Sequence, residues 1–473
     1  MTLGLLSGLS TCLAFFDFGC CASSARILFL RECRFRGKRS ASMYAKCCSS
    51  LQAYKDHLML VSDLDQTMVD HKDSSHAALL NFNLLWAAEY ANKSHLVYST
   101  GRSMHRFMEL QKDAPVLTPD ILILSVGTEI RLGSSLEVDK VWAQELDDGW
   151  DRDIIVQEAL KMPDLRFQEE PDQGSHKVSF KVDRSKGEEM QNILSMRLLN
   201  RGLKVRVVYS SGVDLDVLPY KAGKGQALSY LVAKLNENGM IHKNVLVCGD
   251  SGNDIDLFTV KGVHGVIVSN AQEELVKWHW LNNSNGNILR ASQRCAAAIV
   301  EALHHFNFGP HVHQTEKICE KPLHNSDYSS HLGAVHREVV GLNMFMVKWL
   351  LGEVPNSESS FSRLSCVLND NMKVILPEGI ELTAEEFICK IRREYGSLQE
   401  SGLYIWVDKV TAKQLAEGLY LVTWQPWERL SGMPKKGYYA SAILKSKVEA
   451  PNGMEWLHYH KTLRELMDIQ SLQ

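Results

Sequence analysis

Six short apolar segments recur between residues 57 and 268 of this 473-residue chain, and polar residues follow most of them directly. Apolar runs of this length are typical of strands buried on both faces of a parallel sheet. Apolar residues recur at helical spacing between them, as at Leu79, Phe82 and Trp86. Strands that alternate with helices predict a parallel α/β sheet with right-handed crossovers. The six segments are 57–62, 95–99, 121–126, 215–218, 244–248 and 263–268.

An insertion at about residues 128–212 interrupts this alternation. Two segments, HKVSFKV at 176–182 and LKVRVVYS at 203–210, flank a helical sequence at 187–200. Their alternation of apolar and polar residues is typical of strands with one buried face. We therefore expect a small α+β unit inserted in the α/β domain, which would span residues 55–312.

A second domain is expected at 336–473, after a polar segment at 313–335 that we interpret as a linker. An apolar helix at 339–351 precedes several strand-like segments, and this order predicts an α+β domain. Half of the ten tryptophans lie here, and we interpret them as core residues. The strand-like segments are 404–410, 419–424, 438–444 and 455–460.

Residues 1–54 differ in composition from the rest of the chain, because six of the eleven cysteines lie there. An apolar stretch precedes the basic residues, which is the reverse of a secretory signal. Small polar residues and Asp17 dilute this stretch, so we expect no stable membrane association. We interpret 1–54 as a disordered or targeting-like extension, with Met43 as an alternative initiator.

Charge and cysteine usage restrict the class of protein. The formal net charge of -4 argues against nucleic-acid binding. The five cysteines beyond residue 54 are scattered and form no CxxC pair, as is typical of reduced thiols in an intracellular protein. We expect a cytoplasmic protein, or a plastid protein if the extension is a transit peptide.

Asp63 and Asp65 follow the first apolar segment, in the sequence SDLDQT. In open α/β sheets, functional sites form beyond the carboxyl ends of the strands. Asp63 can attack phosphorus and form an aspartyl-phosphate. Asp65 can protonate the leaving oxygen and later deprotonate water. The pair alone is a weak signal, since aspartate is common in turns after strands.

Two further motifs suit phosphate. Thr100 and Gly101 close the second apolar segment, where a hydroxyl and backbone N–H groups can hold a phosphate or simply cap a helix. Lys224, in AGKG, can neutralise the charge of a phosphoryl group. This is not a Walker A loop, because Pro219 and Gly225 stand where that pattern needs Gly and Ser/Thr.

Asp250 and Asp254, in GDSGND, follow the 244–248 segment. Carboxylate oxygens at a strand end suit Mg²⁺, which takes few protein ligands and keeps several waters. An EF-hand is excluded, because Gly252 stands where its third position needs Asp or Asn. A tight glycine turn is the alternative interpretation of this segment alone.

In this order, the four motifs resemble the haloacid dehalogenase superfamily, whose pattern is DxD, Ser/Thr, Lys and a GDxxND-type loop. Aspartate at position 65 resembles its phosphatase and mutase branch, and the insertion resembles a C2-type cap. Longer segments look like plant-type sucrose-6-phosphate phosphatase, whose appended C-terminal domain is similar to residues 406–410, 421–428 and 456–462. The family-like segments of the first domain are 58–73, 98–103, 117–130, 149–152, 176–180, 215–231, 246–258 and 263–275.

The resemblance implies a Rossmann-like core with an α+β cap at 128–212 and a C-terminal α+β domain of nuclear-transport-factor-2-like shape. Asp63 would be the nucleophile and Asp65 the acid and base, while Lys224 would hold the transferring phosphoryl group. The implied phosphate-binding helpers are Thr100, Gly101 and Asn253. The implied Mg²⁺ residues are Asp63, Asp65 (through its carbonyl), Asp250 and Asp254, the last of which would orient Lys224 or a metal-bound water.

The cap would select the sugar, and hydrogen-bonding side chains are expected there because sucrose offers only hydroxyl groups besides its phosphate. Glu129, His176 and Lys177 are the candidates from family-like segments, although each can equally be a surface polar residue. Gln66 departs from the family's pattern, which often has His or Gly there. It lies beside the two aspartates, so it can tune them but removes no catalytic group.

The implied activity is Mg²⁺-dependent hydrolysis of sucrose 6-phosphate, the final step of sucrose biosynthesis. One alternative is another sugar-phosphate phosphatase, acting on trehalose or mannosyl phosphates. A second is a non-catalytic partner of sucrose-phosphate synthase. The presence of all the catalytic side chains argues against this alternative. The C-terminal domain can in addition serve as a homodimerisation or interaction module.

Overall fold

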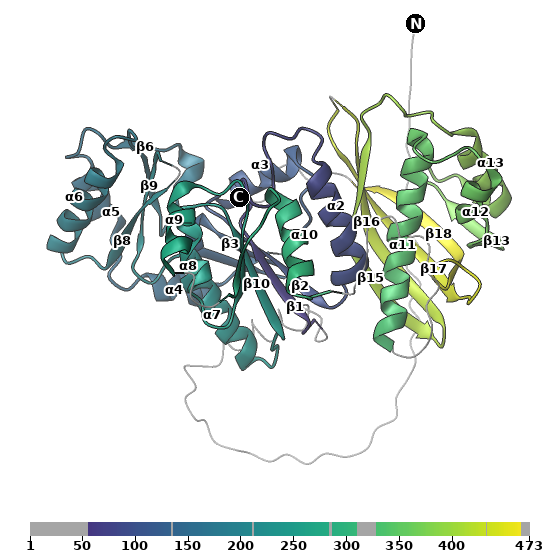
Figure 1. Ribbon diagram of the computed structural model, residues 1–473, viewed down its shortest axis with the longest axis horizontal. Helices are drawn as coiled ribbons and strands as arrows, with labels where there is room; N and C mark the ends of the chain where they lie inside the picture. The colour runs from purple at the N-terminus through teal and green to yellow at the C-terminus, as the bar shows by residue number, and fades with distance from the viewer. Residues whose placement is uncertain are drawn as a thin grey trace, which may run out of the picture.

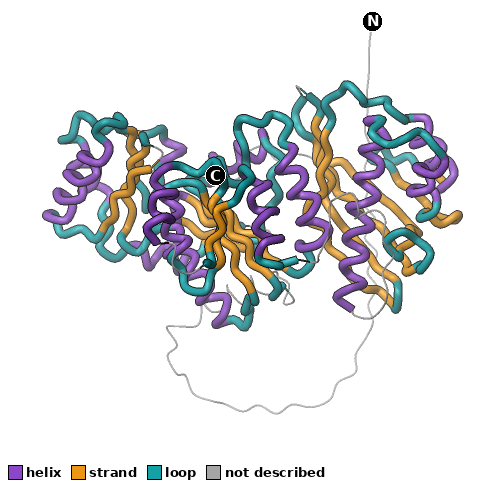
Figure 2. Tube along the Cα trace, viewed as in Figure 1, coloured by secondary structure: helices purple, strands orange, loops and turns teal. Residues whose placement is uncertain are grey.

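The computed structural model describes residues 55–309 and 328–464, apart from 134, 135, 211, 283–285 and 432. The predicted extension at 1–54 and most of the predicted linker at 313–335 lie outside the described residues. Three parts follow one another along the longest axis: a cap, a central α/β core and a C-terminal α+β domain (Figure 1). Figure 2 shows the strands of the core flanked by helices.

The core is an eight-stranded sheet in the order β12-β11-β10-β1-β2-β3-β4-β5. The first six in this order are parallel, and β4 and β5 form an antiparallel edge. The chain leaves β1 toward β2 on one side and later returns to β10 on the other, so β1 lies at a topological switch point. The strands are β1 (Leu58–Ser62), β2 (Ser94–Ser99), β3 (Ile121–Leu124), β4 (Glu129–Leu132), β5 (Glu137–Val138), β10 (Asn244–Gly249), β11 (His264–Ile267) and β12 (Ile288–Arg290).

Helices cover both faces of this sheet, because β1 sends apolar side chains to both sides. Leu58 and Leu60 join one apolar cluster, and Met59 and Val61 join another. The first cluster includes side chains of α2 (Ala77–Leu85), the π-helical turn Trp86–Tyr90, α3 (Met104–Asp113) and α10 (Cys295–His305). The second includes α4 (Lys140–Leu146), α7 (Lys224–Glu237), α8 (Ile255–Phe258) and α9 (Glu273–Asn282).

The cap is a four-stranded antiparallel sheet in the order β6-β7-β9-β8, packed against α5 and α6. The prediction that 215–218 belongs to the parallel core sheet is wrong, since β9 pairs with β7 and β8. Conversely, β4 and β5 belong to the core although the sequence starts the cap near residue 128. The elements are α5 (Arg152–Ala159), β6 (Arg166–Phe167), β7 (Val178–Lys181), α6 (Gly187–Asn200), β8 (Val205–Ser210) and β9 (Asp214–Pro219).

The C-terminal domain packs α11 (Tyr328–Leu351) against a six-stranded sheet in the order β14-β13-β18-β17-β16-β15. The helix begins inside the segment that the sequence assigns to the linker. The four strands predicted at 404–460 form an antiparallel meander, and β13 joins it in parallel with β18. The remaining elements are α12 (Glu358–Ser365), β13 (Leu368–Ile375), β14 (Glu381–Thr383), α13 (Ala384–Arg393), β15 (Tyr404–Ala416), β16 (Leu419–Arg429), β17 (Lys436–Ser446) and β18 (Met454–Arg464).

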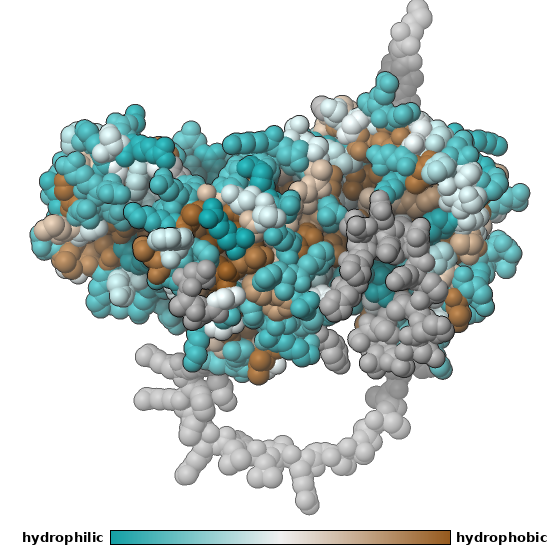
Figure 3. All heavy atoms as spheres, in the orientation of Figure 1, coloured by the Kyte–Doolittle hydropathy of each residue, from teal (hydrophilic) through white to brown (hydrophobic). Residues whose placement is uncertain are grey.

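The predicted fold class is thus confirmed: an α/β core, an α+β cap and a C-terminal α+β domain. Hydrophilic side chains cover most of the face seen in Figure 3, and apolar ones form smaller patches between them. Within the described parts of the chain, no helix has both the length and the apolar character needed to cross a membrane.

Candidate active site

Side chains from all four motifs meet at one edge of the core sheet. Asp63 follows β1, Thr100 follows β2 and Asp250 follows β10, at the carboxyl ends of three neighbouring parallel strands. The backbone N–H of Asp63 donates to the carbonyl of Cys248 at 3.0 Å, which continues the pairing of β1 and β10 beyond the strands. Lys224 reaches the same place from the first residue of α7.

Lys224 is fully buried between two carboxylates. Its Nζ lies 3.0 Å from Asp63 Oδ1 and 2.7 Å from Asp254 Oδ1. Burial alone would lower the pKa of Lys224, but the two carboxylates raise it above its ordinary value, so the ammonium stays charged. The other oxygen of Asp254 accepts the backbone N–H groups of Asp250 and Ser251, each at 3.1 Å. Asp254 therefore holds both the lysine and the loop after β10.

Three buried carboxylates at this edge can hold a metal ion. One oxygen each from Asp63, Asp250 and Asp254 lies within 4.8 Å of the others. Burial raises the pKa of Asp63 and of Asp250, and the neighbouring carboxylates raise it further. When all three are ionised, these carboxylates outweigh the single positive charge of Lys224, and hard oxygen ligands fit Mg²⁺. Since hydrogen bonds already engage both oxygens of Asp254, Asp63 and Asp250 are the better ligands.

Asp65 is held by two basic side chains that the sequence analysis did not select. Arg102 donates from Nε and Nη2 to the two carboxylate oxygens of Asp65, both at 2.7 Å. His71 Nε2 lies 2.6 Å from Asp65 Oδ1. Burial opposes the charge, but the hydrogen bonds from His71 and Arg102 hold the pKa of Asp65 well below its ordinary value. Both residues stand in family-like segments, Arg102 in YSTGRS and His71 in 58–73, which was the available signal for each.

A strained turn after β3 fixes the Thr100 loop. The backbone N–H of Thr100 donates to Ile123 at 2.8 Å, and its carbonyl accepts from Val126 at 3.0 Å. Val126 has a φ of 58°, which is an outlier for a β-branched residue and is tolerated where the surroundings enforce it. A Cβ at Gly127 would overlap the carbonyl of Gly223, so this turn packs directly on the start of α7.

A cleft of about 740 Å³ lies between this edge and the cap, a size suited to a small organic ligand. On the cap side, Lys177 is buried, and its Nζ lies 3.5 Å from both Asp216 Oδ1 and the carbonyl oxygen of Gly101. Ser179 donates to Asp216 at 2.6 Å. The cleft thus has carboxylates and lysines on the cap facing carboxylates and Arg102 on the core.

The structure brings most of the predicted residues together but places two elsewhere. Glu129 pairs with Arg131 within β4, and His176 lies 2.8 Å from Asp147. Arg106 is an additional residue of the cleft: it is the third residue of α3 and forms ion pairs with Glu169 and Asp172 of the cap. The predicted residues that line the cleft are Asp63, Asp65, Gly101, Lys177, Asp250 and Asn253, and Thr100, Lys224 and Asp254 are buried.

Comparison with known proteins gives matches over nearly all of the described chain. Residues 56–307 match the family "Sucrose-6F-phosphate phosphohydrolase", and 335–465 match "Sucrose-6-phosphate phosphohydrolase C-terminal". Sucrose-phosphatase 1 of Nicotiana tabacum is 43% identical over 86% of this chain and 94% of its own length. Probable sucrose-phosphatase 2 of Arabidopsis thaliana is 42% identical over the same shares. The crystal structure of a sucrose-phosphatase from Synechocystis sp. PCC6803, with sucrose and phosphate, is 37% identical, with a TM-score of 0.48 over 53% of this chain and 98% of that one.

Proposed function

Because the chain belongs to the sucrose-6F-phosphate phosphohydrolase family, we propose that it hydrolyses sucrose 6-phosphate to sucrose and phosphate. The observation that carries the proposal is the buried contact between Asp63 and Lys224 at the switch point of the sheet. A nucleophilic carboxylate and a cation fixed beside it supply the two requirements of phosphoryl transfer, which are positioning and charge neutralisation.

In the proposed mechanism, a carboxylate oxygen of Asp63 attacks phosphorus, and the bond from phosphorus to the sugar oxygen breaks. Asp65 gives its proton to that oxygen, and it later takes a proton from the water that hydrolyses the aspartyl-phosphate. Lys224 and the Thr100–Gly101 loop hold the phosphoryl oxygens. Asp65 must carry a proton when the sugar leaves, so its ion pair with Arg102 has to break first. The phosphate group of the arriving substrate is an anion that competes with Asp65 for this guanidinium.

The proposed metal ligands are the carboxylates of Asp63 and Asp250 and the backbone carbonyl of Asp65. When bound there, Mg²⁺ would supply positive charge that offsets the repulsion between Asp63 and an anionic substrate. Asp254 keeps its place beside Lys224 and orients the ammonium.

We assign sugar recognition to the cap residues that line the cleft. Lys177, Asp214 and Asp216 offer charged groups that can bond several hydroxyl groups of a disaccharide. Glu129 and His176 are left out of this proposal because neither side chain lines the cleft.

A substrate panel tests the proposal. Phosphate release is measured with sucrose 6-phosphate, trehalose 6-phosphate, a mannosyl phosphate and 4-nitrophenyl phosphate, at saturating Mg²⁺. We expect the highest kcat/KM with sucrose 6-phosphate and no activity in Asp63→Asn, with Asp56→Asn as the control on an exposed carboxylate of the same domain. A different best substrate would replace the proposed one, and an active Asp63→Asn variant would remove the nucleophile from the mechanism.

We propose a cytoplasmic location for the protein. We also propose that the C-terminal domain binds either a second copy of this chain or a sucrose-phosphate synthase. The support is that its sheet exposes apolar side chains, with Leu421, Tyr439 and Leu463 at 36%, 51% and 53% exposure. Light scattering of the protein alone and of its mixture with the synthase tests both partners.

A further inference from the structure

Four polar contacts between the C-terminal domain and the phosphatase core converge on one short connection, apart from those of α11 with the turn Trp86–Tyr90. This connection, residues 111–119, comprises the last residues of α3 and the chain that leads from them toward β3. Arg429 donates to the carbonyl of Asp113, and Lys435 donates to that of Gln111. Both carbonyls belong to the last turn of α3, where helices have no backbone donors of their own left. Two cations from the other domain therefore cap this helix.

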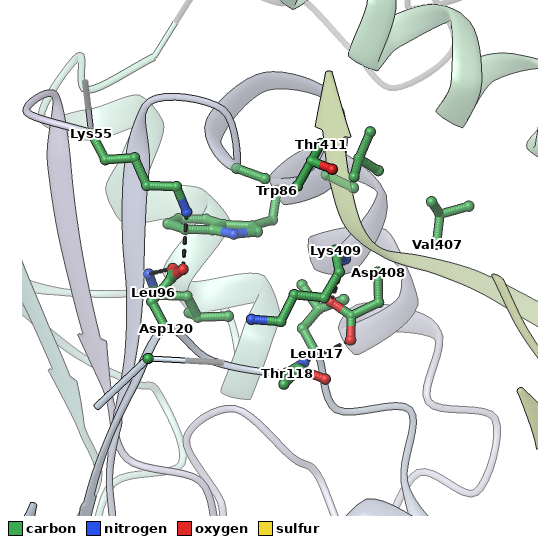
Figure 4. Close-up of a pocket in the computed structure, with 14 residues that line it drawn as sticks. Lys55, Trp86, Leu96, Leu117, Thr118, Asp120, Val407, Asp408, Lys409 and Thr411 are labelled. Carbon is green, nitrogen blue, oxygen red and sulfur yellow. Dashed lines mark hydrogen bonds and ion pairs between the residues drawn. The ribbon is translucent and has the colours of Figure 1, made fainter. Parts of the chain in front are cut away.

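Two residues of β15 hold the other end of the same connection (Figure 4). Asp408 Oδ2 accepts the backbone N–H of Thr118 at 2.9 Å, and Lys409 Nζ lies 3.4 Å from the carbonyl of Pro119. Neighbouring residues of a regular strand point to opposite faces. Here the register of β15 shifts after Asp408, and Lys409 has a φ of 52°, so this bulge lets both residues face the core.

Two of the charged side chains in these contacts, Asp408 and Lys435, are largely shielded from water. Asp408 is only 5% exposed. Lys435 lies over the ring of Trp427, with its Nζ 4.5 Å from the centroid. Trp406 and Trp427 pack in the same apolar cluster as Phe107 of α3, so Lys435 lies on an aromatic surface that is continuous with the core.

Both elements that this connection joins end at the cleft. The residue before the N-cap of α3 is Arg102, which holds Asp65, and Arg106 in its first turn pairs with the cap. At its other end, β3 runs into the turn at Ser125–Gly127, whose Val126 bonds Thr100. A shift of the connection would therefore move both the cap-docking arginine and the phosphate loop.

We propose that the C-terminal domain positions the active site by clamping the α3–β3 connection at both ends. Asp408, Lys409, Arg429 and Lys435 are its positioning residues, and they act on the cleft through Arg102, Arg106 and the turn after β3. The kinetic part of this inference rests on the proposed phosphatase function, whereas the structural part does not.

The test replaces the two cations that cap α3. The clamp variant is Arg429→Met/Lys435→Met, the conservative variant is Arg429→Lys/Lys435→Arg, and the control is Lys436→Met, an exposed neighbour. Hydrogen exchange is followed in α3 and in β10 of the full chain. We expect the amides of α3 to exchange about tenfold faster in the clamp variant and those of β10 to be unchanged. Equal exchange in α3 of the parent and the clamp variant overturns the proposal, as does an equal increase in β10.

Kinetics separate positioning from loss of folded enzyme. For the best sugar phosphate of the parent, we expect kcat/KM of the clamp variant to fall about tenfold, mostly through KM, with recovery in the conservative variant. Loss of folded enzyme lowers kcat at constant KM, and that result overturns the proposal. If the parent prefers another substrate than sucrose 6-phosphate, the proposed function fails, but the exchange result still decides whether the clamp exists.

Discussion

Replacing Lys224 with methionine tests whether this lysine stabilises the protein as well as its proposed transition state. The substitution keeps the unbranched apolar stem but ends one atom short of the ammonium, so it removes the charge between Asp63 and Asp254. Both carboxylates are buried, and breaking a buried pair by removing one partner costs about 3–5 kcal/mol. We expect that loss in the free energy of unfolding by urea, measured with EDTA present so that no metal replaces the ammonium.

The matched control is Lys234→Met, which lies on the same helix α7 but pairs with Glu237 at the surface. Exposed pairs of this kind contribute about 0–1 kcal/mol. With Mg²⁺ restored, Lys224→Met should lower kcat by a factor of about 10²–10³, because a fixed cation beside the transferring group is lost. Lys234→Met should leave kcat unchanged.

A double-mutant cycle isolates the contact with Asp254. In Lys224→Met/Asp254→Asn the carboxylate that the lysine neutralised is gone too, and asparagine keeps an acceptor for the backbone of Asp250. We expect the double variant to be more stable than the sum of the single losses predicts, by about 1–3 kcal/mol. Additive losses, or a Lys224→Met variant as stable as Lys234→Met, would refute this account of the site.

Three further predictions follow from other parts of the structure. Asp65→Asn should lower kcat for sucrose 6-phosphate by a factor of about 10²–10⁴ because the proposed general acid is lost, and it should affect 4-nitrophenyl phosphate less, since nitrophenolate leaves without a proton. Mg²⁺ should raise the melting temperature of the parent by binding the folded state, and Asp250→Asn should abolish that rise, so an equal rise in both would exclude Asp250 as a ligand. Burial lowers the pKa of His95 to about 3 and that of His242 to about 4, where their ring nitrogens lie 2.7 Å apart. Because the unfolded histidines take up protons below about pH 6.5, stability should fall as the pH falls from 7 to 5, by about 2 kcal/mol for each histidine. Urea unfolding at both pH values measures this, and a His95→Gln/His242→Leu variant with the same pH dependence as the parent would contradict it.

The sequence predicts the catalytic edge well because of one rule of topology. Asp63, Thr100 and Asp250 each follow a parallel strand, and the carboxyl ends of neighbouring parallel strands lie at one edge of a sheet. The order of the strands is not readable from the segments themselves, but any order that keeps these three adjacent gives the same cluster.

The same rule fails at Lys224. Segment 215–218 has the apolar character of a core strand, and Leu218 does pack against the core. Its other apolar residues, Leu215 and Val217, face the core of the cap, and β9 pairs with cap strands. Lys224 is therefore brought to the cleft by the N-terminus of α7 and not by the end of a sheet strand. Which sheet a short apolar strand joins depends on its neighbours in space. The spacing of apolar residues along the sequence carries no information about those neighbours.

Partners that are distant in sequence are hidden for a related reason. The connection at 111–119 carries none of the four catalytic motifs, and its hydrogen bonds with the C-terminal domain use its backbone groups, which do not distinguish one residue type from another. On the other side, the side chains of Lys409 and Lys435 reach these groups only because of a bulge at Lys409 and the aromatic rings beneath Lys435. A domain that looks separate in the sequence is thus tied to the helix that carries Arg102 and Arg106. Both arginines line the cleft. We therefore expect that a shift of this domain, for example when it binds a partner, changes the positions of these arginines in the active site.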